Sequence, residues 1–302
     1  MSPRVVVAGT VAVEHLIDTI LLPRQGEGGE EVHVAVGERS FAAGPAGTIA
    51  AAAAATGVAA RVVGAVGEDP AGRACRDRLA RAGVEVDTLR TVSGPTGQIV
   101  ARYRPQVALP GSLNDGPGQT FVLPGAAAGV GAGEAEALEG CRSGDVLVIE
   151  WSSLSSFGWL VDAAYERDLQ VLALLWPLPL LGPTAWTSSG SERNGLGRVD
   201  VAVVDPFGAA ALGESGDGPR SLCTLVGREG LSWDGETFLA PPLGERVETS
   251  PAWSRASLTG ALAAALARGD DRPEAAAAGL AAWAAAIRRH TPYPGSELEV
   301  AP

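Results

Sequence analysis

The sequence predicts an α/β protein built on a mainly parallel sheet with helices on both faces. Short apolar runs alternate with Ala-rich or amphipathic stretches along most of the 302 residues, which is typical of successive β-α-β units. Several runs, such as residues 145–150 (DVLVIE), are apolar almost throughout, as strands buried on both faces are. Hydrophobic residues make up 46 % of the chain. We therefore expect one domain over residues 1–302 with a large core.

The first half of the chain begins with a buried strand that ends at a glycine. Residues 12–41 then alternate weakly and are broken by glycines, which indicates an exposed, partly antiparallel sheet. An Ala-rich helix follows, and a second helix ends at Gly83. In order, the expected elements are a strand at 4–9, the sheet at 12–41, a helix at 49–60, a strand at 61–67, a helix at 70–82, and strands at 99–104 and 121–123.

The second half continues the alternation and ends in two Ala-rich helices. Prolines stop one strand, and a polar loop is expected at 187–197. In order, the expected elements are a strand at 145–150, a helix at 158–167, strands at 171–175, 201–204 and 222–226, and helices at 257–268 and 273–289.

Charge and cysteine content exclude several classes of protein. All 23 basic residues are Arg, so a Walker A lysine and a lysine Schiff base are excluded. The net charge of −12 disfavours nucleic-acid binding. No apolar run is long enough for a membrane span, and no secretory signal is visible. Three isolated cysteines favour a reducing cytoplasm and give no zinc motif, so we expect no metal site from them.

Four short motifs carry a resemblance to a known family. Residues 43–50 (AGPAGTIA) form a glycine-rich signature before an Ala-rich helix, and residues 64–72 (GAVGEDPAG) fit the pattern G-x-V-G-x-D-x-x-G. Residues 83–87 (GVEVD) and 95–97 (PTG) follow in the same order. Together they resemble the ribokinase-like sugar and nucleoside kinases of the PfkB family.

The resemblance implies a ribokinase-like doubly wound α/β domain with a small β lid, formed here by about 12–41 and 98–122. In the family this lid often joins two copies, so a homodimer through the lid is expected. The family implies ATP and Mg²⁺ as cofactors if kinase activity survives.

The segment that would carry phosphoryl transfer departs from the family pattern D-T-x-G-A-G-D. Here it reads ETSPAWSRA over residues 248–256, so Pro251, Ala252 and Trp253 stand at the expected anion hole and Ser254 at the expected base. Proline lacks an N–H donor, and a large side chain blocks the close backbone approach that glycine allows. Loss of a catalytic base alone costs about 10²–10⁴ in rate.

The residues that would bind the nucleotide depart from the family pattern as well. The family's N-x-x-E falls on residues 205–208 (DPFG), so Asp205 remains and the Glu is absent. The strand end T-x-G-x-x-G reads LVGREG over residues 225–230, which keeps Gly227 and Gly230 but replaces the threonine by Leu225.

The residues that would bind the sugar are closer to the family pattern. Glu14 stands where the family has an aspartate that accepts hydroxyl hydrogen bonds, and Gly44 and Thr48 lie in the glycine-rich signature. Thr48 is equally suited to cap a helix. Glu150 ends a buried strand at the place of a family carboxylate, where its alternative role is a cap or a surface ion pair. Trp151 or Trp176 are candidate aromatic walls.

We therefore expect a PfkB-family homologue that keeps a pocket for a small polar ligand, a sugar or a nucleoside, without efficient phosphate transfer. The alternatives are an active kinase with a displaced base such as Glu248, an enzyme of other chemistry in the same pocket, or a protein that binds a protein partner.

Overall fold

A ten-stranded sheet forms the centre of the computed structural model, which describes residues 2–21, 33–103, 119–123, 125–126, 135–150, 154–175, 195–213, 218–226, 230–242, 252–289 and 291–298. Seven adjacent strands run parallel, namely β12, β11, β10, β9, β1, β4 and β5, and the hairpin β13–β14 adds two antiparallel strands at one edge. Side by side, the strands are β14 (Glu236–Leu239), β13 (Gly230–Trp233), β12 (Leu222–Val226), β11 (Val201–Val204), β10 (Gln170–Leu175), β9 (Val146–Glu150), β1 (Arg4–Ala8), β4 (Ala59–Gly67) and β5 (Val84–Glu85), with β6 (Leu89–Val92) also paired to β4.

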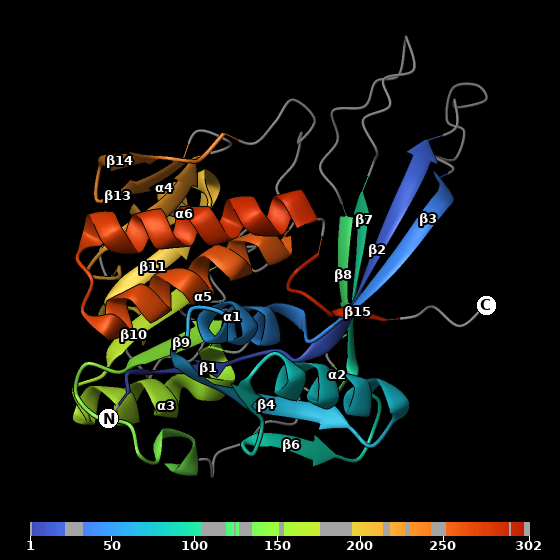
Figure 1. Cartoon of the computed structure of the whole chain (residues 1–302), viewed down its shortest axis with the longest axis horizontal. Coiled ribbons are helices and arrows are strands. Elements are labelled where there is room, and N and C mark those ends of the chain that lie inside the picture. Colours follow the sequence, from blue (N-terminus) through green and yellow to red (C-terminus); the bar gives the residue numbers. More distant parts are fainter. Residues whose placement is uncertain are drawn as a thin grey trace.

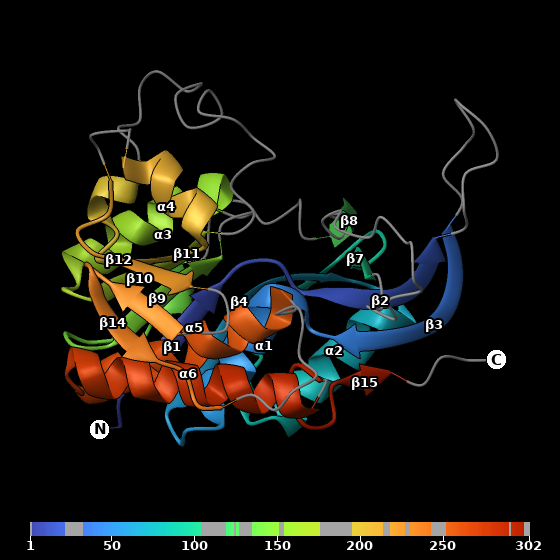
Figure 2. The same ribbon diagram turned by 90° about the horizontal axis from the view of Figure 1, so that it is seen from above.

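Helices cover both faces of this sheet (Figure 1, Figure 2). One face carries α1 (Gly44–Ala54), α2 (Pro70–Arg81), α5 (Ala252–Arg268) and α6 (Arg272–Arg289), and the other carries α3 (Leu154–Glu166), α4 (Pro206–Gly213) and short 3-10 turns. The strands show why both faces need cover. In β1, Val5 and Val7 face the first set of helices, while Val6 and Ala8 face the second set.

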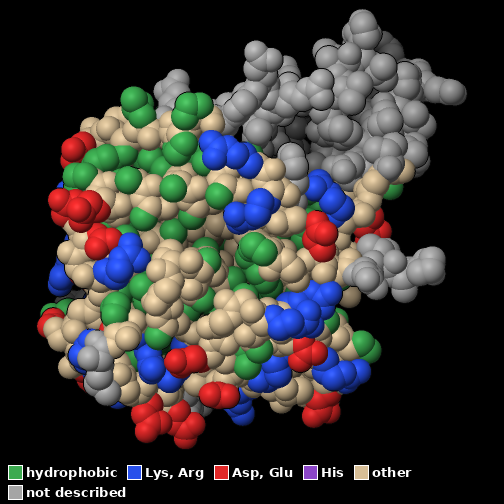
Figure 3. Space-filling model, viewed as in Figure 1, with side chains coloured by type: hydrophobic (Ala, Val, Ile, Leu, Met, Phe, Trp, Pro, Cys, Tyr) green, Lys and Arg blue, Asp and Glu red, His purple; other side chains and the backbone are tan. Residues whose placement is uncertain are grey.

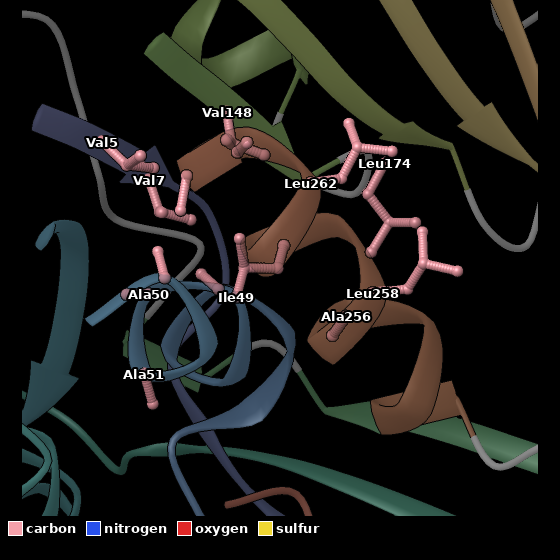
Figure 4. Packing of buried hydrophobic residues seen from close by; sticks show 14 of the residues in the cluster. Val5, Val7, Ile49, Ala50, Ala51, Val148, Leu174, Ala256, Leu258 and Leu262 are labelled. Atoms are coloured by element: carbon pink, nitrogen blue, oxygen red, sulfur yellow. The ribbon is translucent and has the colours of Figure 1, made fainter. Parts of the chain in front are cut away.

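Helices α1 and α5 pack against each other at very short range (Figure 4). Ile49 and Ala50 of α1 belong to the same buried cluster as Leu258 and Leu262 of α5 and the valines of β1. Gly260 makes this approach possible, because a Cβ there would lie 2.1 Å from the backbone oxygen of Ile49. The alanine and glycine content of these helices therefore reflects close helix packing.

A second sheet of five strands stands off the end of the large one (Figure 1). Its order is β15 (Glu297–Leu298), β3 (His33–Ala42), β2 (Ala12–Leu21), β7 (Gly97–Tyr103) and β8 (Gln119–Leu123). Strands β2 and β3 are antiparallel, whereas β2 and β7 are parallel. The sequence segments 12–41 and 98–122 contribute four of the strands, and the C-terminal strand β15 was not predicted.

The predicted α/β architecture with a small second sheet is confirmed, and three helix starts are corrected, one of them that of α3, which begins at Leu154 where 158 was expected. The helix expected from 49 begins at Gly44 and ends at Ala54, because Pro45 suits the first turn of a helix. The helix expected from 257 begins at Ala252, so it includes Trp253 and Ser254. Helix α4, the β13–β14 hairpin and strands β5 and β6 were missed, and most of the expected loop at 187–197 lies outside the described residues.

Acidic and arginine side chains lie interspersed on the face shown in Figure 3, as far as the described residues extend. None of the helices in the described ranges is both long and apolar enough to span a membrane.

Candidate functional site

The end of β1 brings together residues from three elements. Gly9, directly after β1, lies between β9 and α1, since a Cβ on it would be 2.5 Å from Glu150 Cβ and 3.1 Å from Ala46 Cβ. The backbone N–H of Thr10 donates to Glu150 Oε2 at 3.2 Å. Glu150 is buried. This junction lies at the carboxyl ends of parallel strands, where open α/β sheets bind ligands.

The start of α1 folds tightly over this junction. Gly44 adopts a positive φ of 59°, and a Cβ on it would meet Ala12 N at 2.9 Å. Ala43, the residue before it, has a φ of 100° although it is not glycine, which is a strained conformation typical of functional turns. Its methyl group fits because residue 47 is glycine, where a Cβ would lie 2.3 Å from Ala43 Cβ.

Thr48 lies in the second turn of α1 and is 1 % exposed. Its hydroxyl has no hydrogen-bond partner within the described part of the chain. It does not cap the helix, because the N-cap position is Ala43. Ala52, one turn further along α1, lies close to Gly260 of α5, so Thr48 shares the side of α1 that faces α5.

Glu14 is the third residue of β2 and is 3 % exposed. It pairs with Phe41 on β3 and with Ile99 on β7, so apolar side chains flank it on both sides. Burial raises the pKa of the Glu14 carboxyl from 4.5 to about 7, because the charged form loses its hydration. A buried acid with a raised pKa at a strand end is typical of a functional site.

Trp253, in the first turn of α5, fills the space between that helix and the second sheet. Its side chain packs in one cluster with Leu16, Phe41, Ala101 and Ala286. The ring centroids of Trp253 and Phe41 lie 6.4 Å apart. The indole is 3 % exposed and its Nε1 has no partner in the described ranges. The first turn of α5, where the resemblance places an anion hole, thus carries an aromatic side chain that packs against the second sheet.

Ser254, at the expected base position, is fully buried in the first turn of α5. Ala252 is the first residue of the helix. Pro251 lies outside the described residues, as do Trp151, Trp176 and Glu248.

The residues expected on the nucleotide side have structural partners. Asp205 accepts a hydrogen bond from the N–H of Gly208 at 2.7 Å, which caps α4, and its other oxygen lies 3.6 Å from Nη1 of Arg255. Leu225 is buried. Gly230 has a φ of 152° and lies directly against the backbone of β14. Gly227 lies outside the described residues.

The structure thus places Glu150 and Gly44 around the end of β1. Thr48 lies on the side of α1 that faces α5, and Glu14 lies near the start of β2, opposite the Phe41 that packs against Trp253. Sequence reasoning missed the Arg255–Asp205 ion pair and the contact of Trp253 with the second sheet. The only sequence signals for these two contacts were an arginine and a tryptophan at a helix start. Within the described ranges, no three His, Cys, Asp or Glu side chains group so as to hold a metal ion.

Comparison with known proteins agrees with this architecture. Residues 4–102 match the model of the pfkB family carbohydrate kinase. No curated protein matches the chain significantly. The whole chain is similar in fold to a ribokinase from Cryptococcus neoformans in complex with ADP, with a TM-score of 0.73, 20 % identity, and coverage of 95 % of this chain and 94 % of that one.

Two further solved structures show the same likeness. A Burkholderia thailandensis nucleoside kinase in complex with inosine gives a TM-score of 0.76 at 16 % identity, covering 97 % of this chain and 94 % of that one. An Arabidopsis thaliana ribokinase complexed with ribose and ATP gives 0.71 at 19 % identity, covering 98 % and 95 %. At these identities the likeness establishes the ribokinase-like fold.

Proposed function

We propose that this chain, a PfkB-family carbohydrate kinase homologue with the ribokinase-like fold, binds a small uncharged sugar or nucleoside without transferring phosphate to it efficiently. One observation carries the proposal. On the sugar side the buried Thr48 hydroxyl has no hydrogen-bond partner within the described residues, whereas the first turn of α5 on the phosphate side carries an aromatic ring that packs against the second sheet.

The sugar side supports a polar ligand because it contains polar groups that a folded protein seldom leaves unpaired. The Thr48 hydroxyl is buried without a partner, and the described residues offer no hydrogen bond to the Glu14 carboxyl, whose pKa burial raises to about 7. Buried polar groups are nearly always hydrogen-bonded. An ionised carboxylate accepts only, and hydroxyl groups of a sugar donate.

The phosphate side argues against efficient transfer. A catalytic base there would need a carboxylate, and the residue present is the buried Ser254. A developing phosphoryl charge would need backbone N–H groups at the start of α5, where the Trp253 ring packs against Phe41 and Leu16. A lost oxyanion donor costs about 10²–10³ in rate.

ATP and Mg²⁺, which the family uses, do not fit the described residues of this side. Asp205 is already held by the N–H of Gly208 and by Arg255. Gly230 serves the β13–β14 hairpin rather than an open loop. We therefore derive no step through a nucleotide.

The three free thiols support a reducing, cytoplasmic setting.

Calorimetry with inosine and with D-ribose tests the ligand, and a coupled assay for ADP formation with Mg·ATP tests the transfer. We expect one of the two probes to bind and no turnover above background. Glu14→Gln is expected to weaken binding by about tenfold or more, because it removes a charge-assisted hydrogen bond. Thr48→Ala is likewise expected to weaken binding. Its control is Thr88→Ala, since the Thr88 hydroxyl already donates to Val62 O and is not needed for a ligand.

Two results would contradict this function separately. Turnover of the unmodified protein at about 1–10³ s⁻¹, the range of ordinary enzymes, would refute the loss of phosphate transfer. Absence of binding of both probes would refute the sugar pocket and favour a role in binding a protein partner.

We also propose that two copies associate through the second sheet. Among the described strands β8 ends this sheet, and its consecutive residues Phe121, Val122 and Leu123 are 58 %, 48 % and 56 % exposed. Exposed apolar sheet edges are normally covered by another chain or segment. Light scattering is expected to give twice the chain mass of 30.6 kDa, and Phe121→Glu with Leu123→Glu is expected to give a monomer. A monomeric wild type would contradict this contact.

A further inference from the structure

The indole N–H of Trp253 is a buried donor without a described partner. Trp233, which is equally buried on β13, shows the ordinary situation, because its Nε1 donates to Ser221 Oγ at 2.7 Å. Buried tryptophans normally find such an acceptor. Packing alone accounts for a large apolar ring at position 253, but not for the polar edge of an indole.

The Trp253 ring packs on the face of the second sheet that also carries a carboxyl group. Trp253 packs against Phe41 and Leu16, and Glu14 lies opposite Phe41 in the β2–β3 register. Glu14 and Leu16 are two residues apart on one strand, so their side chains share a face of the second sheet. The Glu14 carboxyl and the Trp253 indole therefore border the same face, and the indole does not donate to that carboxyl.

From this juxtaposition we propose that Trp253 determines ligand specificity by donating its indole N–H to an oxygen of the ligand. The inference rests on the proposed function and adds a requirement to it. The ligand presents a hydroxyl donor to Glu14 and an acceptor oxygen to Trp253. It is uncharged, because a buried carboxylate repels an anion. Its ring also presents an apolar face to the indole. Sugars and nucleosides without a phosphate combine these features.

The test compares wild type with Trp253→Phe, which keeps a ring and removes the N–H donor. Calorimetry uses whichever of inosine and D-ribose the wild type binds, together with its monodeoxy analogues and the corresponding 5-phosphate ester. Loss of one neutral hydrogen bond is expected to weaken binding about 3- to 10-fold. Trp233→Phe, which removes an N–H away from the site, is expected to leave the affinity unchanged.

The analogue series identifies the oxygen. One deoxy analogue is expected to bind wild type more weakly and to bind Trp253→Phe no worse than the parent ligand does, since both changes delete the same hydrogen bond. The phosphate ester is expected to bind more weakly than the parent. Two results would overturn the inference and leave the proposed function intact. One is equal affinity of Trp253→Phe and wild type for the ligand. The other is that, for every analogue, the binding free energy lost through the deoxy change adds fully to that lost through Trp253→Phe.

A second measurement does not depend on the folding of Trp253→Phe. In wild type labelled with ¹⁵N in its indoles, the Trp253 N–H resonance, assigned from phenylalanine variants of the other tryptophans, is expected to move downfield on addition of the ligand. An unchanged Trp253 resonance at saturating ligand would overturn the proposal. Absence of any binding to wild type would overturn the proposed function, and this inference with it.

Discussion

Replacing Glu14 by glutamine is expected to stabilise the protein at neutral and alkaline pH. The carboxyl of Glu14 is buried between Phe41 and Ile99, and burial raises its pKa from 4.5 to about 7. Above pH 7 the folded protein must hold a buried, unpaired charge, whereas the unfolded chain exposes this charge to water. Glutamine has a similar shape and carries no charge at any pH.

The direction in which stability changes with pH follows from the protons that the folded and unfolded states bind. A carboxyl whose folded pKa lies above its unfolded pKa contributes stability that is complete below the unfolded value and is lost as pH rises through the folded value. For the shift from 4.5 to about 7, the loss is about 1 kcal/mol at pH 5 and about 3 kcal/mol at pH 8. The advantage of the glutamine variant over wild type should therefore grow by about 2 kcal/mol between pH 5 and pH 8.

Urea unfolding of both proteins at pH 5, 6, 7 and 8, monitored by tryptophan fluorescence and circular dichroism, measures this difference. Glu236→Gln is the control, because Glu236 is an exposed residue of β14. We expect its effect to be constant over the same range. A difference between Glu14→Gln and wild type that does not change with pH would refute the argument that Glu14 is buried without a partner.

Further predictions concern the packing near the site and are tested by urea unfolding. Gly47→Ala is expected to cost about 1–3 kcal/mol, since the new Cβ would lie 2.3 Å from that of Ala43, and the double variant with Ala43→Gly should recover much of this loss; no recovery would contradict the contact. Gly260→Ala should cost about 3 kcal/mol, because its Cβ would meet Ile49 O, and a neutral effect would refute the close packing of α1 and α5. Asp69→Ala removes the hydrogen bonds that hold the start of α2 and should cost about 1–2 kcal/mol; an unchanged midpoint would argue against this cap.

The sequence by itself determined six strands of the large sheet, β1, β4, β9, β10, β11 and β12, and that helices alternate with them, but not β5, β6 or the β13–β14 hairpin. Runs such as 145–150 and 201–204 are apolar at nearly every position, which is typical of a strand buried on both faces. Local signals also placed α2, since Asp69 and Pro70 mark its start and Gly83 follows its end. The departures at residues 251–254 were visible in the same way, because residue identity alone shows that no carboxylate and no glycine stands there.

Only the tertiary structure decided where the side chains at those positions pack. Trp253 packs against Leu16 and Phe41, which lie far from it in the sequence, and no local pattern reports such a contact. The same holds for strand β15, whose two residues become a strand only because β3 offers them an edge. The unpartnered Thr48 hydroxyl and Trp253 indole are likewise properties of packing, since a polar group is satisfied or not according to what the whole fold brings within hydrogen-bond distance of it.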